Sequence, residues 1–145
     1  MLGGCLCGAV RYRYEGPLGG ALGEVTLCHC GQCRRLQGFA AAAAPALAAG
    51  FSVIAGASQI REYESSPGKQ RAFCGTCGSP LYSRREAKPE GIRLRLGSLD
   101  DPPGDLRIEA HIYVENLPAW ADPEGVPRYP GEEPGRGLAP GAGGV

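Results

Sequence analysis

Short runs in which apolar and polar residues alternate dominate this chain. The clearest are residues 9–14 (AVRYRY) and residues 92–96 (IRLRL). A period of two places successive side chains on opposite faces of a β-strand, so both runs are predicted strands. Further runs bounded by Gly, Pro, Ser and Asp predict strands over residues 38–43, 51–54, 59–63, 70–73 and 109–114. The pattern predicts a mainly β protein.

Helix is expected only locally. Residues 40–49 are rich in alanine, but Pro45 interrupts them and Gly50 ends them, so a full helix is not expected there. One helical turn is expected after Cys30. Nine of the sixteen residues from 130 to 145 are Gly or Pro. We therefore predict one domain over residues 1–129 and a disordered tail over residues 130–145.

Composition narrows the range of partners. The chain has 145 residues, with 15 Lys plus Arg and 15 Asp plus Glu. This balance predicts neither a nucleic-acid partner nor an acidic membrane surface. A secretory start and an apolar run of ~18 residues are both missing from the sequence, so a cytoplasmic location is the expectation. The oligomeric state is left open.

Seven cysteines carry the chemistry, in the segments 5–7 (CLC), 28–33 (CHCGQC) and 74–77 (CGTC). Cytosolic thiols are kept reduced, so metal binding is favoured over three disulfides and a spare thiol. The Cys74/Cys77 turn offers two sulfurs and needs two more for a tetrahedral zinc site. Cys5 and Cys7 can supply them, since alternate residues of a strand face the same side.

Cys28, Cys30 and Cys33 then remain and can converge on a second ion with an open fourth position, which is typical of catalytic zinc. Three alternatives stay open. His29 could close this site, Cys74 and Cys77 could pair with this cluster instead, and iron could replace zinc in either cluster.

The cysteine segments resemble one known family, the glutathione-dependent formaldehyde-activating enzymes, which include centromere protein V-like domains. The resemblance rests on residues 4–12 (GCLCGAVRY), 28–35 (CHCGQCRR) and 73–81 (FCGTCGSPL). Residues 63–68 (YESSPG), 111–114 (HIYV) and 118–120 (PAW) also match family landmarks. Coverage runs from about residue 3 to residue 120.

The resemblance implies coiled antiparallel β-sheets of the β-tent type and two zinc ions per chain. It assigns a structural zinc to Cys5, Cys7, Cys74 and Cys77, and a catalytic zinc to Cys28, Cys30 and Cys33. It implies a carbon–sulfur lyase acting on an adduct of a glutathione-like thiol and an aldehyde such as formaldehyde, with the true substrate undecided.

Weaker candidates lie near the second cluster. Arg34 and Arg35 could clamp a substrate carboxylate, His111 could carry a proton or simply stabilise the sheet, and Trp120 is expected to cover the sheet. Two other classes of protein also remain. One is a non-catalytic interaction module with two structural zincs, and the other is a metal or redox sensor that uses the three-cysteine cluster.

Overall fold

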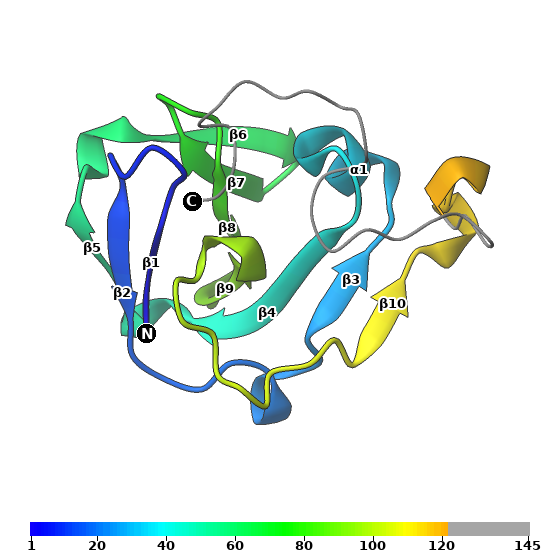
Figure 1. Ribbon diagram of the computed structural model, residues 1–145, viewed down its shortest axis with the longest axis horizontal. Coiled ribbons are helices and arrows are strands. Elements are labelled where there is room, and N and C mark those ends of the chain that lie inside the picture. Colours follow the sequence, from blue (N-terminus) through cyan, green and yellow to red (C-terminus); the bar gives the residue numbers. More distant parts are fainter. Residues whose placement is uncertain (122–145) are drawn as a thin grey trace, which may run out of the picture.

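The computed structural model describes residues 1–121, which form two β-sheets and one α-helix (Figure 1). The mainly β prediction is confirmed. The smaller sheet has the antiparallel order β1-β2-β5, and the larger has the order β10-β3-β4-β9-β8-β7-β6. In chain order the strands are β1 (Leu2–Gly4), β2 (Arg11–Tyr14), β3 (Thr26–Cys28), β4 (Ala41–Leu47), β5 (Phe51–Ala55), β6 (Ile60–Ser66), β7 (Lys69–Cys74), β8 (Pro80–Arg85), β9 (Lys88–Arg95) and β10 (Ala110–Ile112), and the helix is α1 (Gly31–Gln37).

Six short 3₁₀ helices lie in the connections of the described part of the chain. They are Gly20–Leu22, Ala48–Gly50, Ala57–Gln59, Leu96–Ser98, Val114–Asn116 and Ala119–Ala121. The predicted single turn after Cys30 is the longer helix α1. Strands β1, β3 and β8 were not predicted, because each is short or carries a mixed pattern.

One pairing departs from the expected antiparallel arrangement. β10 pairs with β3 in parallel, with Ile112 opposite Cys28. A parallel neighbour needs a long return of the chain, and more than eighty residues separate these two strands in sequence. The parallel pairing brings the segment after Ile112 beside the three-cysteine cluster.

The core lies between the two sheets. Tyr12, Tyr14, Leu81 and Leu94 are fully buried there. Phe51 packs on both Tyr12 and Tyr82 with ring centroids 4.9 Å apart. The buried Tyr12 hydroxyl donates to the Ser98 carbonyl at 3.0 Å, so its polar tip is satisfied. The two sheets thus share one apolar core.

The alanine-rich segment is the central strand β4, not a helix. Five of its seven residues are buried, namely residue 41 and residues 43–46, whereas Leu47 at its end is exposed. Pro45 is tolerated because it lies beyond Ala43, where the pairing with β3 ends. Its carbonyl faces that open side and accepts a hydrogen bond from the Gly19 amide at 3.0 Å, so the missing N–H breaks no ladder bond.

No helix within residues 1–121 has the length and apolar character needed to cross a membrane. The domain boundary predicted at residue 129 and the disordered tail predicted over residues 130–145 lie outside the described residues.

Candidate metal centres

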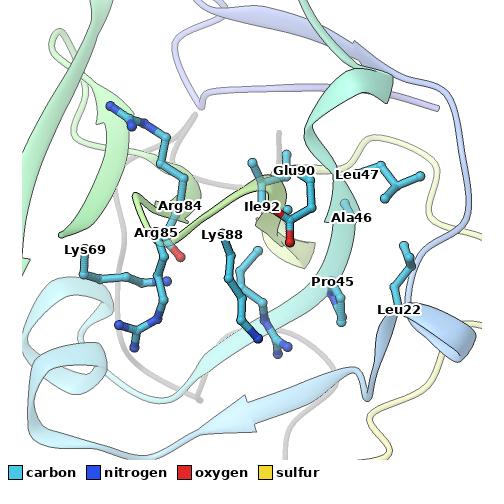
Figure 2. Close-up of a pocket in the computed structure, with 13 residues that line it drawn as sticks. Leu22, Pro45, Ala46, Leu47, Lys69, Arg84, Arg85, Lys88, Glu90 and Ile92 are labelled. Carbon is cyan, nitrogen blue, oxygen red and sulfur yellow. The ribbon is translucent and has the colours of Figure 1, made fainter.

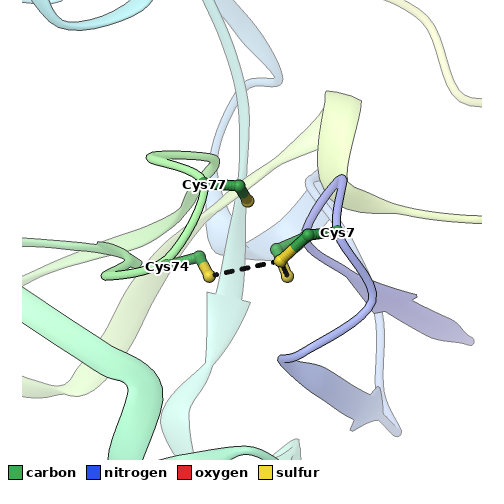
Figure 3. A group of neighbouring side chains, drawn as sticks. Cys7, Cys74 and Cys77 are labelled. Carbon is green, nitrogen blue, oxygen red and sulfur yellow. Dashed lines mark hydrogen bonds between the residues drawn. The ribbon is translucent and has the colours of Figure 1, made fainter.

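Two turns far apart in sequence bring four cysteines together. Cys5 and Cys7 come from the turn between β1 and β2, Cys74 is the last residue of β7, and Cys77 lies in the turn that follows. Figure 3 shows Cys7, Cys74 and Cys77 close together. All four sulfurs lie within 4.8 Å of one another. The predicted pairing of these cysteines is confirmed as a group that could hold a metal ion. The alternative of Cys74 and Cys77 joining the middle cluster does not fit this geometry.

The expected placement of Cys5 and Cys7 on one strand face was wrong. They lie in a tight turn, which the Gly8 amide closes on the Cys5 carbonyl at 3.0 Å, with Gly8 at a φ of 75°. A strand would have pointed two alternate side chains one way, and the turn achieves the same convergence by curling the backbone around them.

The sulfur spacing suits a tetrahedral ion. Four sulfurs about 2.3 Å from a zinc ion would lie about 3.8 Å from one another. The Cys5 and Cys7 sulfurs are 3.5 Å apart, and the Cys7 and Cys74 sulfurs are 3.9 Å apart. The residues present therefore fit a four-thiolate site.

Hydrogen bonds favour the thiolate form on one side of this group. The Ser79 hydroxyl, 3.2 Å from the Cys77 sulfur, and the Ser79 amide lower the pKa of Cys77 to about 5. The pKa of Cys74 is lowered by the Cys77 amide. The pKa of Cys7 is raised to about 11, because contacts with the neighbouring thiols and burial outweigh the hydrogen bond from the Ala9 amide. A metal ion would bring all four thiols to the thiolate form.

The second cluster forms where β3 ends and α1 begins. Cys28 is the last residue of β3, Cys30 caps the helix, and Cys33 lies in its first turn. The three sulfurs lie within 4.8 Å of one another, and within residues 1–121 no fourth His, Cys, Asp or Glu joins them. The cluster could hold a metal ion with three protein thiolates.

Burial and the helix start act differently on these thiols. Burial raises the pKa of Cys28 to about 12. Burial also opposes the charged form of Cys30, but the hydrogen bond from the Cys33 amide, 3.5 Å from its sulfur, together with those from the neighbouring thiols and the Gln32 amide, lowers the pKa of Cys30. Cys30 is thus the thiol of this cluster with the lowered pKa, and its capping role is one that a hydroxyl could also perform.

His29 lies apart from the three sulfurs. It is buried, and its Nε2 lies 3.1 Å from Nδ1 of His111, whose ring stacks on it. This agrees with the expectation that His29 points away from the cluster. His111, the partner of His29 in this stacked pair, lies on β10 and is exposed. It does not line the cavity described in the next paragraph.

A cavity of about 650 Å³ opens beside the three-cysteine cluster, and we call it the cationic cavity. Of residues 1–121, all three cysteines line it, together with six basic residues and no acidic one. Of the predicted arginines, Arg35 lines this cavity and Arg34 does not. The other five basic residues were not among the predicted site residues: Lys69, Arg71, Arg85, Arg93 and Arg95.

The sequence pattern indicates the position of two of these five basic residues, Arg93 and Arg95. Residues 92–96 alternate strictly, so Arg93 and Arg95 had to share one face of β9, opposite Ile92 and Leu94. Leu94 is in the core, which leaves both arginines on the other face of the sheet. The strand predicted over residues 92–96 overlaps β9, but Arg93 and Arg95 on its outer face were not among the predicted site residues.

Arg71 links the cavity wall to the helix that carries the cysteines. Its Nη2 donates to Gln32 Oε1 at 3.0 Å, its Nε to Ser65 Oγ at 2.7 Å, and its Nη1 lies 3.7 Å from the Cys33 sulfur. This buried side chain therefore positions the first turn of α1 against β7.

Replacing Arg71 with methionine should loosen the three-cysteine cluster without unfolding the protein. Such supporting contacts change metal affinity by about 10- to 100-fold. We expect metal at this cluster to become labile to a chelator by a similar factor. Competition with a chromogenic chelator measures this, with Arg84→Met as control, because Arg84 pairs with Glu62 outside the cationic cavity. Equal lability in both variants would contradict the positioning role.

Lys69 is a buried cation among cations. Burial, followed by the charges of Arg85, Arg71, Arg95 and Arg93, lowers the pKa of Lys69 to about 8. Between this value and the ordinary 10.5, the unfolded chain binds more protons than the folded one, so stability rises with pH in that window.

Lys69→Met is accordingly expected to stabilise the fold at pH 7 by about 1–2 kcal/mol, after allowance for solvent screening. The gain should shrink as the pH rises from 8 to 10.5, because the native lysine then becomes neutral. Urea unfolding of both proteins at several pH values, in a buffer without phosphate, measures the difference. A variant less stable than the parent at pH 7 would contradict the prediction that burial and the neighbouring arginines make charged Lys69 destabilising.

Trp120 does not cover the sheet as predicted. Its side chain is 60% exposed and contacts Phe39, with ring centroids 6.1 Å apart. Residues 119–121 form a 3₁₀ helix without a buried residue, so the tryptophan lies at the surface.

The fold and the two clusters define a mainly β protein with one four-cysteine and one three-cysteine candidate metal centre. The family described as "Glutathione-dependent formaldehyde-activating enzyme" matches residues 1–116. The chain belongs to this family.

The chain is also similar to a named relative and to a solved structure. A "Putative glutathione-dependent formaldehyde-activating enzyme" of Halomonas elongata is 30% identical over 129 residues, covering 84% of this chain and 80% of the relative. The crystal structure of a Rhodobacter sphaeroides protein is similar with a TM-score of 0.59 and 30% identity, over 71% of this chain and 92% of that one.

Proposed function

We propose that the protein is a zinc-dependent carbon–sulfur lyase that acts on the adduct of a thiol and an aldehyde. One observation carries this proposal: three cysteine sulfurs converge at the wall of a cavity, without a fourth ligand from the described residues. Family membership and the name of the Halomonas relative support a glutathione-like thiol and formaldehyde as the first substrates to test.

Zinc suits both clusters because thiolates prefer soft ions and short cysteine turns commonly hold zinc. Cys5, Cys7, Cys74 and Cys77 would hold a structural ion, and Cys28, Cys30 and Cys33 a catalytic one. When bound at the second cluster, zinc supplies a fourth position that favours the thiolate form of a substrate thiol. A non-catalytic module would instead need a closed second site.

The chain's own residues supply the charge around that thiol. Burial lowers the pKa of both Arg93 and Arg95, and the nearby thiolate charges of Cys28 and Cys33 offset part of this effect. Cations so placed also lower the pKa of a thiol that enters the cavity. The same cations stabilise negative charge that develops on an aldehyde oxygen.

The bond changes follow from this placement. In synthesis, the sulfur electron pair forms the carbon–sulfur bond while the carbonyl π pair moves to oxygen, which takes up the proton that the thiol released. In the lyase direction, the hydroxyl loses its proton, the carbonyl re-forms, and the carbon–sulfur bond breaks with its electron pair on sulfur. Reactants and products then balance without an oxidant or reductant.

The direct test is exchange spectroscopy by nuclear magnetic resonance on a mixture of glutathione and formaldehyde. We expect the interconversion of free and adduct forms to be faster with the protein than with buffer containing zinc. Equal rates would contradict lyase activity on the adduct of glutathione and formaldehyde, and other aldehydes would then be compared in the same way.

Thiol ligation has a separate test. Glutathione and S-methylglutathione share every group except the ionisable sulfur. We expect the free thiol to bind at least about tenfold more tightly, because only a thiolate can take the fourth position. Equal affinities in a calorimetric titration would contradict thiol ligation.

A further inference from the structure

Three neighbouring strands place four basic residues on one face of the larger sheet. Lys69 on β7 pairs with Arg85 on β8, and Arg93 on β9 pairs with Ser83 on β8. Arg95 follows Arg93 by two residues and so faces the same way. We call these four residues, Lys69, Arg85, Arg93 and Arg95, the cationic row. All four line the cationic cavity.

The cationic row lacks acidic partners within the described part of the chain. The ion pairs found there join Arg11 to Asp100 and Arg84 to Glu62, and neither includes a member of the row. Arg95 is only 5% exposed, and its Nε has no hydrogen-bond partner among residues 1–121. Buried charges are normally paired, so this arrangement points to an anion that the cavity receives.

The thiolates of the metal cluster are too few to serve as that anion. Three thiolates on a divalent ion leave one net negative charge, and a substrate thiolate adds a second. The cationic row and Arg71 together are five cations. Arg71 donates to Gln32 and Ser65, and Arg93 donates to Thr26 and the Ala43 carbonyl, but all these acceptors are uncharged, so the excess of positive charge remains.

A second cavity of about 440 Å³ extends the binding space. It shares Lys69, Ser83, Arg85 and Arg93 with the cationic cavity, so three members of the row form a wall common to both, whereas Arg95 lines the cationic cavity alone. Figure 2 shows Lys69 and Arg85 on one side of this second cavity and the apolar Pro45 and Leu22 on the other. A ligand with its sulfur at the cysteines can therefore reach past the row.

We infer that the substrate thiol carries at least two further negative charges, as two carboxylates or one phosphate monoester, which the cationic row binds. This inference rests on the proposed function for the position of the sulfur, whereas the anion site itself follows from the row. The inference assigns anion binding to the cationic row and not to Arg34, which lies outside the cationic cavity.

Calorimetric titration of the zinc-loaded protein at fixed ionic strength tests this with three small thiols. They are 2-mercaptoethanol without charge, 3-mercaptopropionate with one carboxylate, and mercaptosuccinate with two. We expect affinity to rise by about tenfold for each added charge, as charge-assisted hydrogen bonds form. Succinate and inorganic phosphate, which lack sulfur, should compete with mercaptosuccinate, and the stronger competitor identifies the preferred anion.

Variants locate the effect. Lys69→Gln and Arg95→Gln should each reduce the preference for mercaptosuccinate by about tenfold. Neither side chain holds the fold together by hydrogen bonds, since Lys69 makes none within residues 1–121 and Arg95 makes one long contact of 3.5 Å to Ser83. Arg13→Gln removes an exposed arginine on β2 and should change nothing.

The outcomes separate this inference from the proposed function. If thiols bind equally regardless of charge and the anions do not compete, the anion site is wrong while thiol ligation stands. If succinate or phosphate binds and the row variants abolish this, while a thiol adds no affinity, the anion site stands and thiol ligation is wrong. An equal loss in Arg13→Gln would overturn the anion site as well.

Discussion

Replacing Cys74 with serine is expected to unfold the protein at ordinary temperatures. Cys74 is fully buried, and its sulfur belongs to the group that joins the β1–β2 turn to the β7–β8 turn, 67 residues apart in sequence. Structural zinc contributes about 10–16 kcal/mol to the folding of small zinc domains, and whole domains have a stability of about 5–15 kcal/mol. Losing one ligand should therefore remove most of the stability.

Thermal unfolding followed by circular dichroism measures this loss. Thr76→Ala is the matched control, because Thr76 is exposed in the same turn and its hydroxyl bonds only to the Gln59 side chain within the described residues. The control should lose no more than about 1 kcal/mol. A strong chelator should reproduce the effect of Cys74→Ser on the parent protein. Unchanged melting of the serine variant would show that this cluster does not support the fold.

Cys30→Ser should have the opposite profile, with the fold retained and activity lost. Cys30 caps α1 through its sulfur, which accepts a hydrogen bond from the Cys33 amide. Serine is a preferred capping residue, so the helix should still form. With two thiolates left, the second ion should become labile, and turnover should fall by at least about 100-fold.

The two cysteine variants control each other. Circular dichroism should report a native Cys30→Ser protein and an unfolded Cys74→Ser protein, while the exchange assay should report no activity for either. Full activity of the Cys30→Ser protein would contradict a catalytic role for the second cluster. A Cys30→Ser protein that unfolds like Cys74→Ser would instead make the second cluster structural.

Part of each ligand group could be predicted from the sequence because cysteine spacing is local. Cys74 and Cys77 lie three residues apart, and Cys28, Cys30 and Cys33 lie within six residues, so each set converges locally. Spacing alone left open whether Cys74 and Cys77 join Cys5 and Cys7, because that pairing depends on the fold that brings the two segments together. The strands with clear alternation, such as β2 and β9, were predictable because alternation is also a local pattern. β8 was not, because its buried positions are Leu81 and the polar Ser83, so apolar and polar residues do not alternate along it.

The cationic row could not be predicted from local pattern. Its members lie on β7, β8 and β9, and their meeting depends on the order and register of three strands. Sequence pattern places Arg93 and Arg95 on one face, but nothing local brings Lys69 and Arg85 to them. β3 was missed because three residues beside a cysteine cluster show no period, and its place depends on pairing with β4 and β10.

Zinc-edge X-ray absorption of the purified protein, with and without added glutathione, tests most directly whether the second cluster is an open thiol-binding zinc site. One four-thiolate and one three-thiolate zinc per chain predict an average of about 3.5 sulfur ligands, rising to about 4 when the thiol is added. An average of about 4 from the start, or one that does not change with thiol, would contradict an open site.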